Sequence, residues 1–64
     1  MKSYSSREVI KMLKKDGWFF VGQEGSHRQY KHPTKKGLVT VTHPKKNVPT
    51  PTLKSIERQA GLRF

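Results

Sequence analysis

The sequence contains no cysteine, and only four of its 64 residues are acidic. Without cysteine, neither a disulfide framework nor a cysteine-based zinc site is possible, and a reducing compartment is expected. No apolar run approaches the roughly 20 residues that a membrane-spanning helix requires. The first residues carry charges and lack the apolar region of a signal peptide. We therefore expect a cytoplasmic protein that does not contact a membrane and needs no cofactor.

Basic residues dominate the charged positions. Fourteen lysines and arginines stand against the four acidic residues, which gives a formal net charge of +10. So strong a positive field on a small surface attracts polyanions, chiefly nucleic acid, or else an acidic protein partner. Charge alone separates neither RNA from DNA nor either of them from an anionic membrane. We expect nucleic-acid contact, with a merely solubilising surface as the alternative.

Helix signals begin near the N-terminus. Ser5 and Glu8 have the spacing of a capping box, and the apolar residues that follow, as far as Leu13, recur at helical intervals. Gly17 suits the left-handed residue that comes after a helix. The pattern predicts a first helix over Ser6–Asp16.

Strand signals fill the middle of the chain, over residues 18–21, 27–32 and 38–42. These segments are rich in aromatic and β-branched residues, and short turns separate them, so an antiparallel meander is predicted. In the second segment, Tyr30 is expected to point inward together with Arg28. The opposite face of that strand then carries His27, Gln29 and Lys31.

A second helix is predicted near the C-terminus, with Thr50 as its cap, Pro51 in its first position and Gly61 at its end. The order helix, three strands, helix favours one two-layer α+β domain over residues 1–64, with both helices on one face of a three-stranded antiparallel sheet. The residues expected to form the core are Trp18, Phe20, Val39, Val41, Leu53 and Ile56.

Histidine is the candidate catalytic group. His27, His32 and His43 lack the spacing of a metal site, and no nucleophile motif of a hydrolase occurs, so no metal is expected. Metal-free RNA cleavage needs less, because the ribose 2′-hydroxyl is the nucleophile and the protein supplies only an acid or base and cations. The ordinary imidazole pKa near 6.5 suits that role, so His27 is a candidate for it, with an ordinary exposed surface histidine as the alternative. His32, which precedes Pro33, is expected to be structural.

Residues around His27 suit contact with an RNA backbone. Gly25 and Ser26 lie in the preceding turn, where glycine lets a phosphate approach the backbone closely. The cations expected to contact phosphates are Arg28, Lys31, Lys45 and Lys46. Because Tyr30 points inward, no aromatic residue is expected to remain free on the open face for base stacking. The residues alone leave two alternatives open, a non-catalytic RNA-binding module of the same fold and a basic protein-interaction module.

Several motifs follow one another along nearly the whole chain. They are Ser6-Arg7-Glu8-Val9-Ile10-Lys11-Met12-Leu13, Lys15-Asp16-Gly17-Trp18, Gly25-Ser26-His27, Gln29-Tyr30, Lys31-His32-Pro33, Lys36-Gly37, His43-Pro44-Lys45-Lys46, Thr52-Leu53 and Gln59-Ala60-Gly61-Leu62. In this order they resemble HicA-type toxins of bacterial HicBA toxin–antitoxin systems. The resemblance implies a fold like that of double-stranded RNA-binding domains and an endoribonuclease that cleaves mRNA, with His27 as its catalytic residue.

The same resemblance implies a protein partner. A HicB-type antitoxin is expected to bind this chain and block its catalytic surface, and a net charge of +10 suits an antitoxin of complementary charge. The free toxin is expected to be a monomer.

Overall fold

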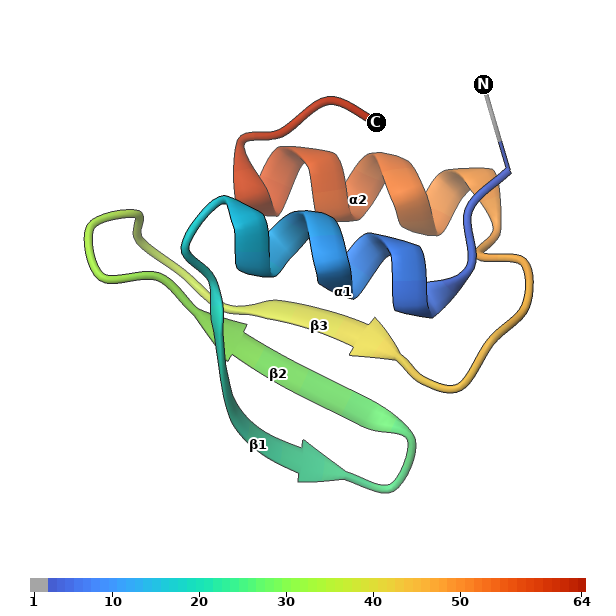
Figure 1. Ribbon diagram of the computed structural model, residues 1–64, viewed down its shortest axis with the longest axis horizontal. Coiled ribbons are helices and arrows are strands. Elements are labelled where there is room, and N and C mark those ends of the chain that lie inside the picture. Colours follow the sequence, from blue (N-terminus) through green and yellow to red (C-terminus); the bar gives the residue numbers. More distant parts are fainter. Residues whose placement is uncertain (1–2) are drawn as a thin grey trace.

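The chain folds into two helices and one three-stranded sheet in the computed structural model, which describes residues 3–64. The elements are α1 (Ser6–Lys15), β1 (Phe19–Glu24), β2 (His27–Lys31), β3 (Val39–Thr42) and α2 (Thr50–Ala60). The strands pair antiparallel in chain order, and the two helices lie side by side on one face of the sheet (Figure 1). The predicted two-layer α+β fold is confirmed.

The capping box at the start of α1 forms as predicted. The Ser5 hydroxyl accepts the backbone N–H of Glu8 at 3.2 Å, and the Glu8 carboxylate accepts the backbone N–H of Ser5 at 3.0 Å. The helix ends at Lys15, with Asp16 as its cap, and Gly17 then adopts a φ of +104°. Two of the N–H groups that a helix start leaves without intrahelical partners are thus satisfied locally.

The start of α2 differs from the prediction. Thr50 is the first residue of the helix, and Pro49 is the cap, with no side-chain hydrogen bond. The physical reason is that Pro51 has no N–H, so this first turn has one donor fewer for a cap to satisfy. At the other end, Gly61 takes the expected left-handed conformation with a φ of +65°.

Strand β1 begins one residue later and runs further than predicted, as far as Glu24, and it contains a bulge. Phe20 pairs with Tyr30, but the next paired residue, Gly22, faces Gln29, so Val21 has no partner on β2. A bulge of this kind shifts the alternation of side chains by one residue. Phe20 therefore points to the helix side, whereas Glu24 points to the open face of the sheet.

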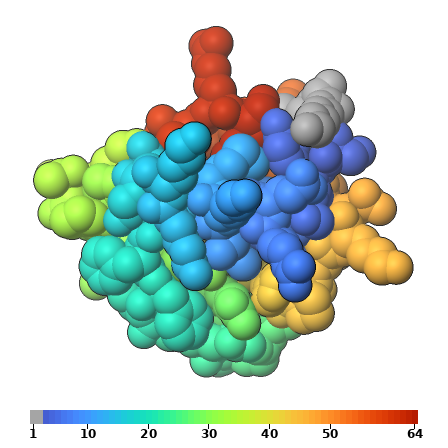
Figure 2. Space-filling model, viewed as in Figure 1, coloured from blue at the N-terminus to red at the C-terminus, as the bar shows by residue number. Residues whose placement is uncertain are grey.

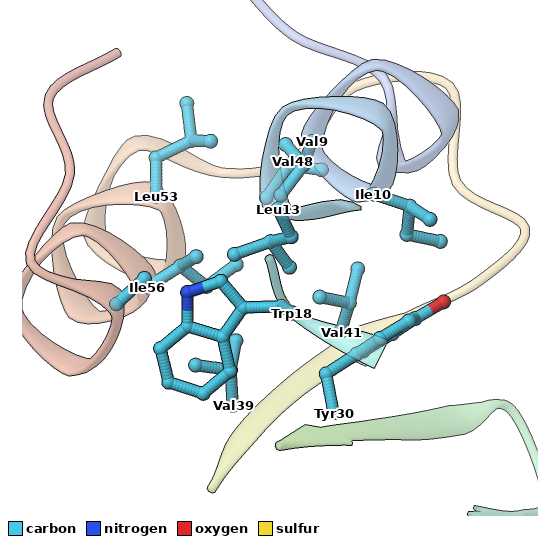
Figure 3. Packing of buried hydrophobic residues seen from close by; sticks show 11 residues of the cluster. Val9, Ile10, Leu13, Trp18, Tyr30, Val39, Val41, Val48, Leu53 and Ile56 are labelled. Carbon is cyan, nitrogen blue, oxygen red and sulfur yellow. The ribbon is translucent and has the colours of Figure 1, made fainter. Parts of the chain in front are cut away.

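The core lies between β3 and the two helices, as Figure 3 shows. Trp18 and Tyr30 are its largest side chains. The prediction that Phe20 belongs to the core is wrong, because its side chain is 48% exposed. Both helices pack chiefly against β3 rather than against the edge strand β1, so Phe20 stays half-exposed, with its ring against the edge of the Tyr30 ring and below the Arg28 guanidinium.

A polar clamp joins three distant segments at the end of α1. The Nε2 atom of His32 lies 2.7 Å from the carbonyl oxygen of Asp16, while its Nδ1 accepts the backbone N–H groups of Thr34 and Lys35. Lys35 also donates to the Asp16 carboxylate at 2.6 Å and to the carbonyl oxygen of Ala60 at 3.0 Å. His32 thus has the structural role that the sequence predicted.

The hydrogen bond from Lys35 lowers the pKa of the Asp16 carboxyl below its ordinary value. Because the folded pKa is the lower one, the clamp stabilises the fold fully above the pH at which an unfolded aspartate titrates. Its contribution is lost as the pH falls through the lowered pKa of the folded protein.

We predict that Gly17→Ala destabilises the fold more than Gly37→Ala does. Both glycines have a φ near +100°, at +104° and +93°, so both substitutions strain the backbone, at about 1–2 kcal/mol. Only at Gly17 would the new Cβ also lie 2.9 Å from the Nε2 of His32, since no atom lies within 4 Å at Gly37. Urea unfolding should show a further loss of about 1–2 kcal/mol for Gly17→Ala. Equal losses in the two variants would contradict this account of the His32 contact.

Candidate functional site

Three segments meet at one end of the molecule, opposite the β2–β3 turn. These are the β1–β2 turn, the start of α1 and the loop between β3 and α2 (Figure 1). The backbone N–H of His43 donates to the carbonyl oxygen of Ser26 at 2.8 Å, and that of Ser6 donates to the carbonyl oxygen of Lys45 at 2.9 Å. Backbone hydrogen bonds therefore fix the relative positions of the catalytic candidate and the basic loop.

His27 is the first residue of β2 and lies on the face of the sheet that the helices leave uncovered. Tyr30 is fully buried on the helix side, and side chains along β2 alternate, so His27 must point to the opposite face. The residue is exposed, and in the described part of the chain no hydrogen bond or ion pair fixes its imidazole. An imidazole in this position is open to a large substrate.

The nearest neighbours of His27 on the open face come from the two adjacent strands. Glu24 is its partner on β1 and Thr42 its partner on β3, and directly paired residues of an antiparallel sheet place their side chains on the same face. The sequence analysis missed both neighbours. The two-residue turn Gly25-Ser26 is a local signal that Glu24 pairs with His27. No local signal indicates how β2 and β3 are aligned.

Further along the open face, Lys31 is exposed and pairs with Phe19. Phe19 is 49% exposed, which overturns the expectation that no aromatic residue is free on this face. The reason is that adjacent residues of a strand point to opposite faces, so one of Phe19 and Phe20 must lie on the open side, and the register of β1 places Phe19 there. The face therefore offers a cation and a half-exposed aromatic ring beyond His27.

Arg28 lies on the helix side of β2, as its alternation with His27 predicted. Its guanidinium lies over the Phe20 ring, 5.8 Å from the ring centre. Its Nε atom is buried with no hydrogen-bond partner among residues 3–64, and the buried hydroxyl of Tyr30 likewise has none. The structure thus separates Arg28 from Lys31, the other cation that β2 contributes to the predicted site.

The basic loop carries the remaining predicted cations. Lys45 and Lys46 are exposed, and side chains of this loop, orange in Figure 2, project beside the start of α1. The turn residues Gly25 and Ser26 are exposed as well, and Gly25 has a φ of +59°. The predicted site residues at this end of the molecule therefore share one neighbourhood, although they do not all share one face.

A hydrogen-bond network that the sequence analysis missed holds the loop. The Ser6 side chain is 1% exposed, its hydroxyl lies 2.7 Å from the Nδ1 of His43, and it accepts the backbone N–H of Lys45 at 2.9 Å. These partners are far apart in sequence, so no local pattern reveals the network. Its effect is to fix the imidazole of His43 and the backbone of the basic loop against α1.

Two kinds of feature are absent from residues 3–64. No group of three or more histidine, cysteine or acidic side chains is placed to hold a metal ion. No helix in this range has the length and apolar character needed to cross a membrane. The chemistry available at this end of the molecule is that of imidazole, ammonium, guanidinium and hydroxyl groups, together with the Glu24 carboxylate beside His27.

Comparison with known proteins identifies the family. Residues 6–62 match the family model described as HicA toxin of bacterial toxin-antitoxin. The chain therefore belongs to the HicA toxin family of toxin–antitoxin systems. A chain of the solved "HicA3 and HicB3 toxin-antitoxin complex" matches its structure with a TM-score of 0.83 and 26% sequence identity, over 95% of this chain and 98% of that chain. A search of curated protein sequences finds no match.

We predict that Ser6→Ala destabilises the protein by about 1–3 kcal/mol, because it leaves the Lys45 N–H and the His43 Nδ1 without their buried partner. The control is Ser26→Ala, at an exposed serine, which should change the free energy of unfolding by less than about 0.5 kcal/mol. Denaturant unfolding of the two variants measures the difference. A Ser6→Ala protein as stable as the control would show that the network contributes nothing to the fold.

Proposed function

We propose that this HicA-family chain is a metal-independent endoribonuclease that cleaves mRNA, with His27 as its catalytic acid or base. The observation that carries the proposal is the position of His27, which is exposed on the uncovered face of a HicA-family fold. Neither a passive RNA-binding module nor a protein-interaction module requires an imidazole there. The excess of basic residues suits a polyanionic substrate.

In the proposed reaction the ribose 2′-hydroxyl attacks the adjacent phosphorus. His27 takes the hydroxyl proton as the new oxygen–phosphorus bond forms, and the bond from phosphorus to the 5′-oxygen breaks as that oxygen takes a proton from water. The products are a 2′,3′-cyclic phosphate and a 5′-hydroxyl. A positioned general base of suitable pKa contributes on the order of 10²–10⁴ to the rate.

Cations near His27 hold the RNA backbone in this proposal. Lys31 lies on the same face of β2, and Lys45 and Lys46 lie in the loop that is hydrogen-bonded to the turn before His27. Such contacts recognise phosphates rather than bases, so they position the strand without reading its sequence. The half-exposed ring of Phe19 provides a surface on which a base can stack.

We also propose a HicB-type antitoxin as the protein partner. The structural match to a chain from a complex of HicA3 and HicB3 supports this partner. A net charge of +10 on the toxin favours an antitoxin whose contact surface is acidic. Inhibition then follows if the antitoxin covers the open face that carries His27.

We expect His27→Ala to lose RNA cleavage by a factor on the order of 10²–10⁴ while it keeps its fold and its antitoxin binding. The imidazole is exposed and makes no hydrogen bond in the described structure, so its removal costs little stability. The control is Lys36→Ala, at an exposed residue in the β2–β3 turn at the other end of the molecule. Cleavage by purified His27→Ala at the wild-type rate would refute the assignment.

Cleavage should persist in the presence of a strong chelator, because the proposed mechanism uses no metal. Mass spectrometry of the products should find 2′,3′-cyclic phosphate or 3′-phosphate ends. Products with a 3′-hydroxyl and a 5′-phosphate would show that water, not the 2′-hydroxyl, attacks phosphorus, and this mechanism would then be wrong.

The affinity for an uncleavable RNA should fall steeply with salt. Each phosphate contact contributes roughly 0.7 to the log–log slope for a single strand, so removal of Lys45 and Lys46 together should flatten the slope by about one to two units. A charge-matched control is Lys36→Ala with Lys54→Ala, at two exposed lysines outside the loop. An unchanged slope in the Lys45/Lys46 variant would mean that these lysines do not contact phosphates.

A further inference from the structure

A cavity of about 650 Å³ opens at the start of α1, on the helix side of the sheet. Three of the residues that line it are cations, one is a histidine and none is acidic. The lining residues are Ser5, Ser6, Arg7, His43, Pro44, Lys45 and Lys46. The nearby carboxylate of Glu8 is engaged by the N–H of Ser5 in the capping box. The cavity is therefore electropositive and suits an anionic group.

Side chains, rather than the helix terminus, give the cavity its donors. The first backbone N–H of α1, from Ser6, donates to the carbonyl oxygen of Lys45, and that of Glu8 donates to the Ser5 hydroxyl. These two N–H groups are not free to bind an anion. Of the first three N–H groups of α1, that leaves at most the one of Arg7, so an anion in the cavity would be bound mainly by the side chains of Arg7, His43 and the two lysines.

The contact with Ser6 determines which nitrogen of His43 carries a proton. The Ser6 hydroxyl accepts the N–H of Lys45, and its own proton needs an acceptor, which the Nδ1 of His43 provides at 2.7 Å. With Nδ1 as acceptor, the neutral ring is protonated on Nε2. If the ring is a cation instead, Nδ1 donates to Ser6 and Nε2 still carries a proton.

The remaining arrangement is a neutral ring with the proton on Nδ1. The hydroxyl proton of Ser6 would then need another acceptor, and none occurs among residues 3–64. Ser6 is 1% exposed, so water offers little compensation. Ser6 therefore keeps an N–H donor on Nε2, the polar atom of His43 that remains available to the cavity.

We propose that this cavity is a second phosphate subsite, which binds an RNA phosphate next to the scissile one through the Nε2–H of His43 and the cations of Arg7, Lys45 and Lys46. The proposal rests on the ribonuclease function above. Ser6 is its positioning residue, because it orients the imidazole without contacting the RNA.

The position of the cavity relative to His27 supports this subsite. The N–H of His43 donates to the carbonyl oxygen of Ser26, so the cavity is adjacent to the residue that precedes His27. His27 points to the open face, while His43 points to the helix side, where it contacts Ser6. An RNA strand that crosses this end of the sheet meets His27 on one face and the cavity on the other.

Two substitutions of His43 separate its contact with Ser6 from its contact with phosphate. In His43→Asn the side-chain amide can replace Nδ1 and keep the contact with Ser6, but nothing reaches the cavity. In His43→Gln the longer amide can place an N–H₂ donor where Nε2 stands. Each full-length variant is titrated with a 2′-O-methyl RNA, which lacks the nucleophile, and separately with inorganic phosphate. Thermal unfolding confirms that each variant is folded.

We expect His43→Asn to bind the modified RNA about tenfold more weakly than the wild type, the effect of one lost charge-assisted hydrogen bond. His43→Gln should stay within about threefold of the wild type, because its donor remains. In the wild type, ¹H–¹⁵N correlation spectra of the imidazoles should find Nε2 of His43 protonated and its signal shifted by both titrants.

Two results would overturn the subsite. One is a folded His43→Asn protein that binds the modified RNA as tightly as the wild type, and the other is a neutral His43 protonated on Nδ1. If the wild type still cleaves RNA in either case, the ribonuclease function stands without the subsite. If inorganic phosphate shifts the His43 signal in a chain that cleaves no RNA, the anion site is supported and the ribonuclease function fails instead.

Discussion

The packing of both helices against β3 is the interaction on which the arrangement of this small domain depends. Val39 and Val41 point toward the helices and are buried, so the residues between and after them point to the open face. Directly paired residues of β2 and β3 point to the same face, so Tyr30, opposite Val39, is buried and His27, opposite Thr42, is exposed. Because the helices cover only one face and pack chiefly against β3, the fold retains an open sheet surface.

Signals that lie close together in the sequence predicted much of the fold. The capping box of Ser5 and Glu8, the inward position of Tyr30 and the glycine after each helix could be read directly, as could the exposure of His27 opposite Tyr30. Contacts between distant segments could not be predicted in this way. The exposure of Phe20 depends on which strand the helices cover, and the Ser6–His43 network joins residues on different elements, so neither leaves a local pattern.

The excess of positive charge lowers the stability of the isolated protein. Asp16 contacts Lys35 at 2.6 Å and lies 4.0 Å from His32, and the sequence has only four acidic residues to set against its basic ones. Most of the 14 basic residues therefore repel one another with little compensation. An anionic partner, whether RNA or an acidic protein surface, relieves this repulsion when it binds. The excess of positive charge therefore makes the free chain less stable than a complex with an anionic partner.

The unpaired Val21 in β1 has a consequence for the residues on either side of it. Trp18, just before β1, and Glu24, at its end, are separated by an even number of positions, so in a regular extended segment they would point the same way. The bulge breaks this parity, so Trp18 can lie in the core while Glu24 joins the surface around His27. Loss or gain of a single residue between these two positions would turn either Trp18 away from the core or Glu24 away from the face that carries His27. The number of residues between Trp18 and Glu24 is therefore constrained to the residue.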